Sequence, residues 1–518
     1  MAFNGPEGVE TENVTLEVVR LVPGRPGTSQ PEDSASAPEK TDAAHPTAEG
    51  LFVGRARELR ELEAGLDGSF SGRGTLFLVG GEPGIGKSRL ADELASHAAT
   101  RGARVLWGRC WEAGGAPAYW PWVQSIRSYV RGQEQGELVS QLGSGAADVA
   151  QLIPELHDLL PELQMAAPLD PEGARFRLFD STSTFLRNAA SAQPMLLVLD
   201  DLHAADVPSL LLLRFLTGTL AETHIMVVGV YRDEGIEGDH PLALALAELI
   251  RERVTRQLHL GGLDGSDAAR LIEATASVVP PDALVATVHR QTEGNPLFIG
   301  EVMRLLVAEG RLQALADAAP LKITIPPQVR EVIERRLRRL PKECVRILTV
   351  AAILGREFGL DVLHQTSGLS RDALLGILDD AVAARVVIEV PAVPGRMSFS
   401  HALIRDTLYD ALTPGHRVQL HREIGEALER LYGDDPEPHV AELAHHFCEA
   451  ATGEESAKAV DYARLAGNRA VSLLAYEEAI RLYQLGLQTL AGSADEATTA
   501  VNRAVDIAFE AVRILYSG

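Results

Sequence analysis

Cysteines are scarce in this sequence, and long apolar runs are absent. The 518 residues include three cysteines, Cys110, Cys344 and Cys448, whose wide spacing matches no metal-binding pattern. We expect buried, reduced thiols in a cytoplasmic protein. No run of about 18 apolar residues occurs, and the first residues lack the basic start and apolar core of a signal peptide. We therefore expect neither a membrane span nor secretion.

Basic residues are also few relative to acidic ones. Lysine and arginine together number 48, against 72 aspartates and glutamates, so the formal net charge is −24. This excess of negative charge argues against a protein dedicated to coating nucleic acid, although it is compatible with one local basic helix. Hydrophobic residues make up 46% of the chain, which allows folded cores, and the length suffices for about three or four domains.

A glycine-rich turn between a strand pattern and a helix pattern is the dominant feature. Residues 81–88 read GEPGIGKS and fit the phosphate-binding pattern G-x-x-x-x-G-K-[ST]. Gly81, Gly84 and Gly86 let backbone N–H groups turn toward phosphate oxygens without interference from a Cβ atom. The helix that follows directs its positive N-terminal end at the same anion. The pattern predicts a nucleotide site.

The end of this turn supplies the side chains. Lys87 is expected to reach the β- and γ-phosphates, and Ser88 to hold Mg²⁺. Arg89, the next residue, belongs to the expected nucleotide-binding set. The dinucleotide pattern G-x-G-x-x-G does not fit, because Arg89 stands where its third glycine would be.

A second acidic motif follows a buried strand pattern at residues 196–201, LLVLDD. The carboxyl end of a parallel strand lies at the edge of the sheet where phosphates bind. We expect Asp200 to coordinate Mg²⁺, directly or through water, and Asp201 to polarise the attacking water. The alternative is an ordinary strand end that precedes a helix cap.

An arginine follows the next apolar strand pattern, at residues 225–231. Arg232 would emerge beside the Mg²⁺ site, where it could form charge-assisted hydrogen bonds with the γ-phosphate. The alternative is a surface arginine that pairs with Asp233.

The pattern of strands and helices predicts an α/β P-loop NTPase core with a five-stranded parallel sheet over residues 51–262. Its strands are expected at 75–79, 104–107, 195–199, 225–231 and 257–260. Residues 110–192 form a helical insertion with an aromatic cluster at Trp111, Tyr119, Trp120 and Trp122. This cluster is either the core of a small subdomain or a lid near the nucleotide.

Four further regions flank this core. Residues 1–50 read as a disordered linker with one weak strand pattern at 13–22. Residues 263–324 read as a helical lid domain, with helices at 267–274, 282–292 and 296–308. Residues 325–412 read as a winged helix, with helices at 328–339, 343–354 and 371–383 and a hairpin at 386–390 and 397–400.

Residues 413–518 read as helices throughout. The pair at 457–473 and 475–490, with a further helix at 494–515, resembles tetratricopeptide (TPR) repeats. Such arrays bury a core by stacking, so we expect either a shortened array or a partner that completes it. A basic stretch at 330–342 either binds DNA phosphates or presents a charged outer face over a core-facing apolar stripe.

These motifs together resemble the STAND class of signal-transduction ATPases, within the AAA-like P-loop proteins. The set consists of Val53, Gly54 and Arg55, residues 81–88, residues 196–201, Arg232, and the segment Gly294, Asn295 and Pro296. The chain is most similar to the bacterial LuxR and maltose-regulon-activator branch, without the terminal DNA-binding domain. The resemblance implies that Val53 and Arg55 lie near the adenine and that Pro296 packs against it.

The segment 399–406, FSHALIRD, resembles the Met-His-Asp segment of plant and animal relatives. In those proteins the histidine touches the β-phosphate of ADP in a closed state, so His401 is a candidate nucleotide sensor. Ala402 replaces the acidic residue of that segment. The alternative is a half-buried histidine at a domain joint.

The sequence therefore favours a cytoplasmic regulatory switch that binds ATP or ADP with Mg²⁺ and hydrolyses ATP slowly. A protein or small-molecule inducer would act at the C-terminal helices, and nucleotide could drive self-association, in transcriptional or signalling control. Direct nucleic-acid binding is not expected. The alternatives are a DNA-binding transcriptional regulator and an active AAA-type DNA-loading or remodelling ATPase.

Overall fold

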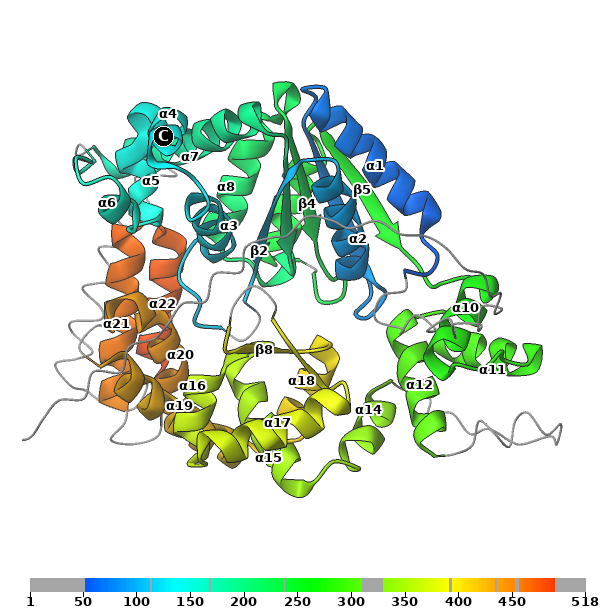
Figure 1. The fold of residues 1–518 in the computed structure, drawn as a ribbon. Helices are drawn as coiled ribbons and strands as arrows, with labels where there is room; N and C mark the ends of the chain where they lie inside the picture. The colour runs from blue at the N-terminus through cyan, green and yellow to red at the C-terminus, as the bar shows by residue number, and fades with distance from the viewer. Residues whose placement is uncertain are drawn as a thin grey trace, which may run out of the picture. The chain divides into compact units, whose positions relative to one another are not determined.

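Five short strands form one parallel sheet at the centre of Figure 1. The strand order is β2-β3-β4-β1-β5, and every neighbouring pair is parallel. β1, β3 and β4 are buried at every position, as expected for strands that helices cover on both faces. The predicted α/β core with a five-stranded parallel sheet is confirmed. The strands are β1 Thr75–Gly81, β2 Arg104–Arg109, β3 Met195–Asp200, β4 Ile225–Val230 and β5 Thr255–Leu260.

The computed structural model describes residues 52–111, 114–166, 169–236, 238–309, 329–390, 394–433, 436–451 and 456–489. The predicted linker 1–50, its strand pattern at 13–22 and the helix expected at 494–515 lie outside these residues. The described residues all belong to one compact unit.

Two apolar clusters cover the two faces of the sheet. On one face, α1 (Ala56–Phe70) and α2 (Lys87–Thr100) pack their buried leucines against β1, β3 and β4. On the other face lie α8 (Val207–Thr217), α9 (Pro241–Leu249) and the helices of the insertion. This two-sided burial fixes the loops at the carboxyl edge of the sheet.

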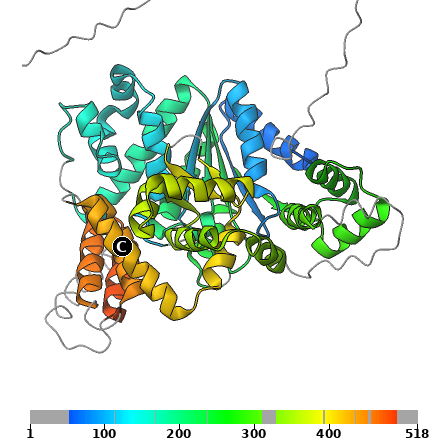
Figure 2. The same cartoon turned by 60° about the horizontal axis from the view of Figure 1, so that its bottom comes forward.

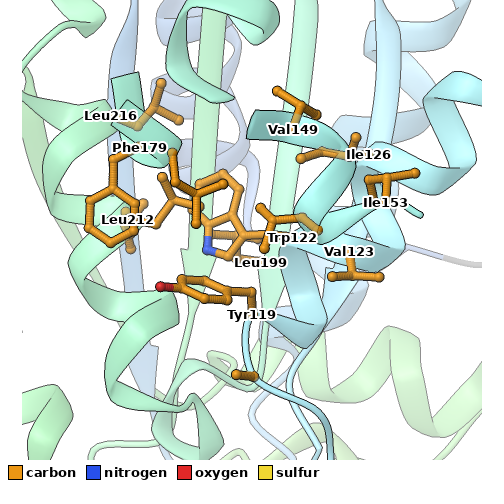
Figure 3. Close-up of a cluster of buried hydrophobic side chains, with 14 of the residues drawn as sticks. Tyr119, Trp122, Val123, Ile126, Val149, Ile153, Phe179, Leu199, Leu212 and Leu216 are labelled. Atoms are coloured by element: carbon orange, nitrogen blue, oxygen red, sulfur yellow. The ribbon is translucent and has the colours of Figure 1, made fainter. Parts of the chain in front are cut away.

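The insertion forms a helical subdomain around buried aromatic rings. Tyr119 and Trp122 are essentially fully buried, and Figure 3 shows both rings among side chains from the insertion, α8 and the sheet. The indole N–H of Trp122 donates to the carbonyl of Ser209 at 3.0 Å. These two residues therefore serve the core. The helices are α3 Trp120–Val130, α4 Gln135–Leu142, α5 Ala146–Leu152, α6 Leu156–Leu159 and α7 Pro171–Ala192.

Three helices follow the sheet and form their own apolar cluster. They are α10 (Gly265–Ala276), α11 (Asp282–Thr292) and α12 (Pro296–Ala308). The side chain of Asn295 caps α12 by accepting hydrogen bonds from the first free N–H groups, as Asn does at many helix starts. The predicted bounds of α11 and α12 match the structure.

Residues 329–410 combine helices with a small antiparallel sheet of order β6-β8-β7. The apolar residues Val332, Ile333 and Leu337 are buried, as the core-facing interpretation of the basic stretch predicts. The winged-helix assignment remains a prediction. The elements are α14 Val329–Leu337, α15 Lys342–Leu354, β6 Glu357–Gly359, α16 Leu360–Ser367, α17 Arg371–Ala383, β7 Val387–Glu389, β8 Arg396–Phe399 and α18 Ala402–Asp410.

The last described region is helical and TPR-like. It comprises α19 (Pro414–Tyr432), α20 (Val440–Ala450), α21 (Ser456–Ser472) and α22 (Tyr476–Thr489), each packed on the next. In Figures 1 and 2 these helices, orange to red, lie beside the cyan insertion, and Arg175 of α7 pairs with Glu477 at 2.8 Å. Among the described residues, none of the helices has the length and apolarity that crossing a membrane requires.

Candidate nucleotide-binding site

The loop between β1 and α2 has the backbone conformation that its glycines predict. Gly81, Gly84 and Gly86 have φ values of 150°, 80° and 102°, which residues with a side chain rarely adopt. A Cβ atom on Gly84 would lie 2.7 Å from the Cβ of Leu297. The loop and the start of α12 can pack this closely because Gly84 has no side chain.

Lys87 is folded onto this loop. Its ammonium donates to the carbonyls of Gly81 at 2.7 Å and Glu82 at 2.8 Å. Burial and, to a lesser degree, the charge of Arg232 lower the pKa of the Lys87 ammonium to about 8, whereas nearby aspartates oppose the shift. The loop holds this cation where phosphate oxygens would lie.

Ser88 and Asp200 lie together, as the two motifs predict. The Ser88 hydroxyl donates to Oδ1 of Asp200 at 3.1 Å. The other carboxylate oxygen of Asp200 is buried without a hydrogen-bond partner among the described residues, 3.6 Å from Nε of Arg109. A hydroxyl and an under-satisfied carboxylate are the oxygen donors that Mg²⁺ prefers, so these residues fit that ion.

Asp201 forms an ion pair with a residue that sequence analysis did not identify. Its Oδ2 accepts a hydrogen bond from the Arg356 guanidinium at 2.7 Å, and only 8% of its side chain is exposed. The backbone of Asp201 is left-handed, with φ of 58°. Arg356 lies 155 positions away, immediately before β6, so this pair joins the core sheet to the region 329–410.

Two more ion pairs join the same two parts of the chain. Arg109, at the end of β2, pairs with Glu357. Arg232, at the end of β4, lies 3.9 Å from the carboxylate of Asp406. Asp233, the alternative partner for Arg232, lies 3.3 Å from His259. Figure 2 shows the yellow elements of residues 329–410 over this end of the sheet.

Val53 and Arg55 lie at the other side of the loop. Val53 is buried, and the Arg55 guanidinium donates to the carbonyls of Ile85 at 3.0 Å and Gly261 at 2.5 Å. Arg55 thus ties the phosphate loop to the residue after β5. Arg89 is more exposed and pairs with Glu93 at 3.3 Å.

The helical domain contacts the loop through Asn295 and Pro296. The side-chain N–H of Asn295 donates to the Pro83 carbonyl at 3.0 Å, and the backbone N–H of Leu297 donates to Gly84 at 3.3 Å. Pro296 lies within 4.0 Å of a Cβ position on Gly86. The start of α12 therefore packs directly on the phosphate loop.

His401 lies at a joint between three regions. It is half-buried before α18, and burial lowers its pKa to about 4, so the imidazole is neutral near pH 7. Glu301 of α12 and Arg356 are among the charged groups that act on it. Glu301 is fully buried and pairs with Arg304 at 2.7 Å and Arg336 at 2.5 Å. Burial opposes ionisation of Glu301, but the two arginines hold its pKa below the usual value.

Residues 51–228 match the protein family described as the AAA ATPase domain. The chain carries an AAA-type P-loop ATPase domain. A crystal structure of a STAND protein with a tetratricopeptide repeat sensor, from Pyrococcus horikoshii, is similar over 91% of this chain and 67% of its own, with a TM-score of 0.51. At 12% identity this likeness shows the fold alone.

A curated relative is also similar over most of this chain. An uncharacterized protein of Rhizobium meliloti is 25% identical in an alignment of 476 residues that covers 87% of this chain. The chain spans 44% of the length of that relative.

The structure gathers most of the predicted residues at one edge of the ATPase sheet. The residues that sequence analysis missed are the charged partners Arg109, Arg356, Glu357 and Asp406. Arg109 carried a usable signal, since it ends a strand of the parallel sheet beside Asp200. The other three come from short elements whose approach to the ATPase domain only the tertiary structure reveals.

Proposed function

We propose that this protein is a regulatory switch that binds ATP or ADP with Mg²⁺ and hydrolyses ATP slowly. The observation that carries this proposal is the 2.7 Å hydrogen bond between Arg356 and Asp201. A carboxylate that is engaged by a guanidinium is less basic and is turned away from water, so it is a poor orienter of the attacking water molecule. Hydrolysis would then depend on separating residues 329–410 from the ATPase sheet.

The remaining residues suit nucleotide capture. The glycine-rich loop, Lys87 and the N-terminus of α2 would hold the phosphates, Val53 and Pro296 would lie toward the base, and Ser88 and Asp200 would hold Mg²⁺. The ion, when bound, screens the charge that develops on the transferred phosphoryl group. Arg232 and His401 are proposed sensors of the phosphates, because each lies in or beside the joint that residues 329–410 make with the core.

The experiment measures retained nucleotide and steady-state ATP turnover together. Lys87→Ala should abolish nucleotide retention, and Asp201→Ala should retain nucleotide but lose hydrolysis. Arg356→Ala should raise turnover severalfold because it frees the Asp201 carboxylate, whereas the control Arg346→Ala, which removes an exposed arginine paired with Glu343, should not.

Unchanged turnover in Arg356→Ala, with Asp201→Ala still inactive, would contradict the proposal that this pair restrains hydrolysis. Rapid turnover of the unmodified chain that DNA stimulates would favour the remodelling ATPase. Specific, salt-sensitive DNA binding would favour the transcription factor.

A small-molecule inducer is supported by a cavity of about 490 Å³. It lies where the insertion, the β6 segment and the C-terminal helices meet, and its lining includes Trp120, Phe358, Tyr432 and Ala470. This volume lies within the range of known small-molecule sites. A ligand there would contact all three regions and bias the same joint. A ligand-induced rise in thermal midpoint that Ala470→Phe abolishes would support this use, and a rise that persists would oppose it.

A further inference from the structure

Three histidines from two neighbouring helices of the C-terminal region converge on one point. His421 belongs to α19, and His445 and His446 belong to α20. One ring nitrogen from each lies within 4.8 Å of the other two, and Nδ1 of His421 is 3.0 Å from Nδ1 of His446. The ring centroids are 5.1 to 5.4 Å apart. No motif of the sequence and no step of the proposed switch uses these residues.

The cluster is buried and its rings are neutral. His421 and His446 are 1% and 2% exposed. Burial lowers the pKa of His421 to about 4 and of His445 to about 3, and it lowers the pKa of His446 well below its usual value. Each neutral imidazole keeps one nitrogen with a lone pair, which is the form that binds metal ions.

The hydrogen bonding within the cluster is incomplete. Nε2 of His421 is buried and has no hydrogen-bond partner among the residues that the structure describes. A buried polar atom without a partner is destabilising, so its presence calls for an explanation. A ligand that binds all three rings would explain the incomplete hydrogen bonding.

The surrounding charge does not exclude a cation. Three arginines act on the cluster electrostatically, and each has a carboxylate partner. Arg405 pairs with Asp406 at 3.1 Å, Arg417 lies 3.8 Å from Asp410, and Arg481 pairs with Glu478 at 2.6 Å. The positive charge near the imidazoles is therefore largely compensated.

We propose that His421, His445 and His446 bind a zinc ion. Three imidazoles with an open fourth position form a common Zn²⁺ ligand set, whereas Mg²⁺ and Ca²⁺ prefer oxygen ligands. Zn–N bonds of about 2.0–2.1 Å at tetrahedral angles place the nitrogens about 3.4 Å apart. The observed spacings, from 3.0 Å between Nδ1 of His421 and Nδ1 of His446 to at most 4.8 Å, bracket this value.

The position of the site gives the ion a structural consequence. A Cβ atom on Gly114 would lie 2.8 Å from Nδ1 of His445, so the segment between β2 and α3 passes directly over the cluster. An ion held there would join α19 to α20. It would also hold in place the histidine side chains that contact the segment between β2 and α3. The proposal is independent of the nucleotide switch, because none of its ligands belongs to that site.

The test measures metal content and affinity in the full chain. Protein freed of metal with a chelator is titrated with Zn²⁺ against a chromophoric competitor, in excess Mg²⁺. We expect one Zn²⁺ per chain and, with Co²⁺, the intense visible bands of a tetrahedral site. Loss of a residue that only hydrogen-bonds to a metal ligand typically lowers metal affinity by roughly 10- to 100-fold. In the double variant His445→Ala/His446→Ala the affinity for Zn²⁺ should fall by more than this. His416→Ala, an exposed histidine on α19, is the matched control and should bind like the unmodified chain.

Two outcomes would overturn the proposal. One is less than a tenth of an equivalent of Zn²⁺ on the unmodified chain, a result that depends on no variant. The other is equal affinity in the double variant and its control. The single variant His445→Gln repeats the affinity comparison at the least buried of the three positions, where misfolding is least expected, and circular dichroism would check that it folds.

Discussion

Two joints meet at the carboxyl edge of the sheet, and they are built differently. The helical domain α10–α12 reaches the phosphate loop through hydrogen bonds to the loop backbone, from Asn295 and Leu297. The buried carboxylate of Glu301 on α12 pairs instead with Arg336 of α14 and joins this domain to residues 329–410. The region 329–410 reaches the sheet through side-chain ion pairs, chiefly Arg356–Asp201, whose carboxylate is buried, and Arg232–Asp406, whose side chains are partly exposed.

This difference indicates which joint opens. Removing one partner of a buried charge network typically costs about 3–5 kcal/mol, whereas a partly exposed pair such as Arg232–Asp406 is worth about 1 kcal/mol or less. The close backbone contact of α12 with the loop makes the helical domain part of the proposed nucleotide site. The joint formed by ion pairs can open when a nucleotide or ligand binds the open state more tightly than the closed state.

The largest effect is expected at the buried charge network around Glu301, which joins α12 to α14. Glu301→Ala leaves Arg304 and Arg336 without their shared carboxylate, so the stability of the chain should fall by about 3–5 kcal/mol. Urea denaturation should report a lower midpoint. Glu343→Ala removes an exposed partner of Arg346 and should change stability by less than about 1 kcal/mol. Equal shifts in the two variants would contradict the distinction between buried and exposed charge pairs.

The next effect concerns Lys87, which lies between the joints. Its pKa of about 8 means that the protonated fraction falls from about 0.9 at pH 7 to about 0.1 at pH 9, and the affinity of the nucleotide-free chain for ATP should fall about tenfold. Calorimetric titration measures this change, and adenosine, which lacks phosphates, is the control ligand.

The lowered pKa of Lys87 also affects stability, which should rise with pH whereas the affinity for ATP falls. The folded pKa of Lys87 lies below the value of 10.5 in the unfolded chain, so the unfolded state binds more protons between these values. The contribution of Lys87 to the free energy of unfolding should therefore rise with pH between about 8 and 10.5. An ATP affinity that stays constant from pH 7 to pH 9 would show that the lysine is not perturbed in this way.

A smaller effect distinguishes capping from contact with the loop. Asn295→Ala removes both the cap of α12 and the hydrogen bond to Pro83, and should cost about 1 kcal/mol of stability and weaken nucleotide binding. Asp264→Ala removes the equivalent cap of α10, which does not touch the loop. It should lower the thermal midpoint similarly and leave the nucleotide affinity unchanged. If both variants bind nucleotide equally well, Asn295 acts on the helix alone.

The smallest effect tests the ion-paired joint as a whole. Raising the salt concentration to about 1 M shortens the screening length to about 3 Å and should weaken the partly exposed pairs. Turnover at saturating ATP should then rise about twofold, and this rise should be smaller in Arg356→Ala. A salt effect of the same size in both proteins would place its origin elsewhere.

Much of this architecture was predictable because its signals are local. Buried parallel strands read as apolar runs, and the phosphate loop and Asp200 follow from short motifs whose spacing the chemistry dictates. β6, with three residues, and the adjacent α16 were missed, since so short a strand has no usable periodicity and is defined by its pairing with β8.

The partners of the site residues were harder to predict. Arg356 and Asp201 are 155 positions apart, and nothing in either segment specifies the other. The histidine cluster has a weak signal in the adjacent pair His445 and His446, but the third member comes from another helix. Sequence patterns identify residues that bind a defined chemical group, whereas contacts between domains depend on surfaces that form only after folding.

The left-handed backbone of Asp201 implies a trade-off between activity and durability. A non-glycine residue at φ of 58° carries about 1 kcal/mol of steric strain that glycine would not. Selection for a robust fold alone would favour glycine at this turn. On the role proposed for Asp201, the aspartate here trades some resistance to unfolding for a carboxylate at the end of β3, and Asp201→Gly would relieve the strain while removing that carboxylate.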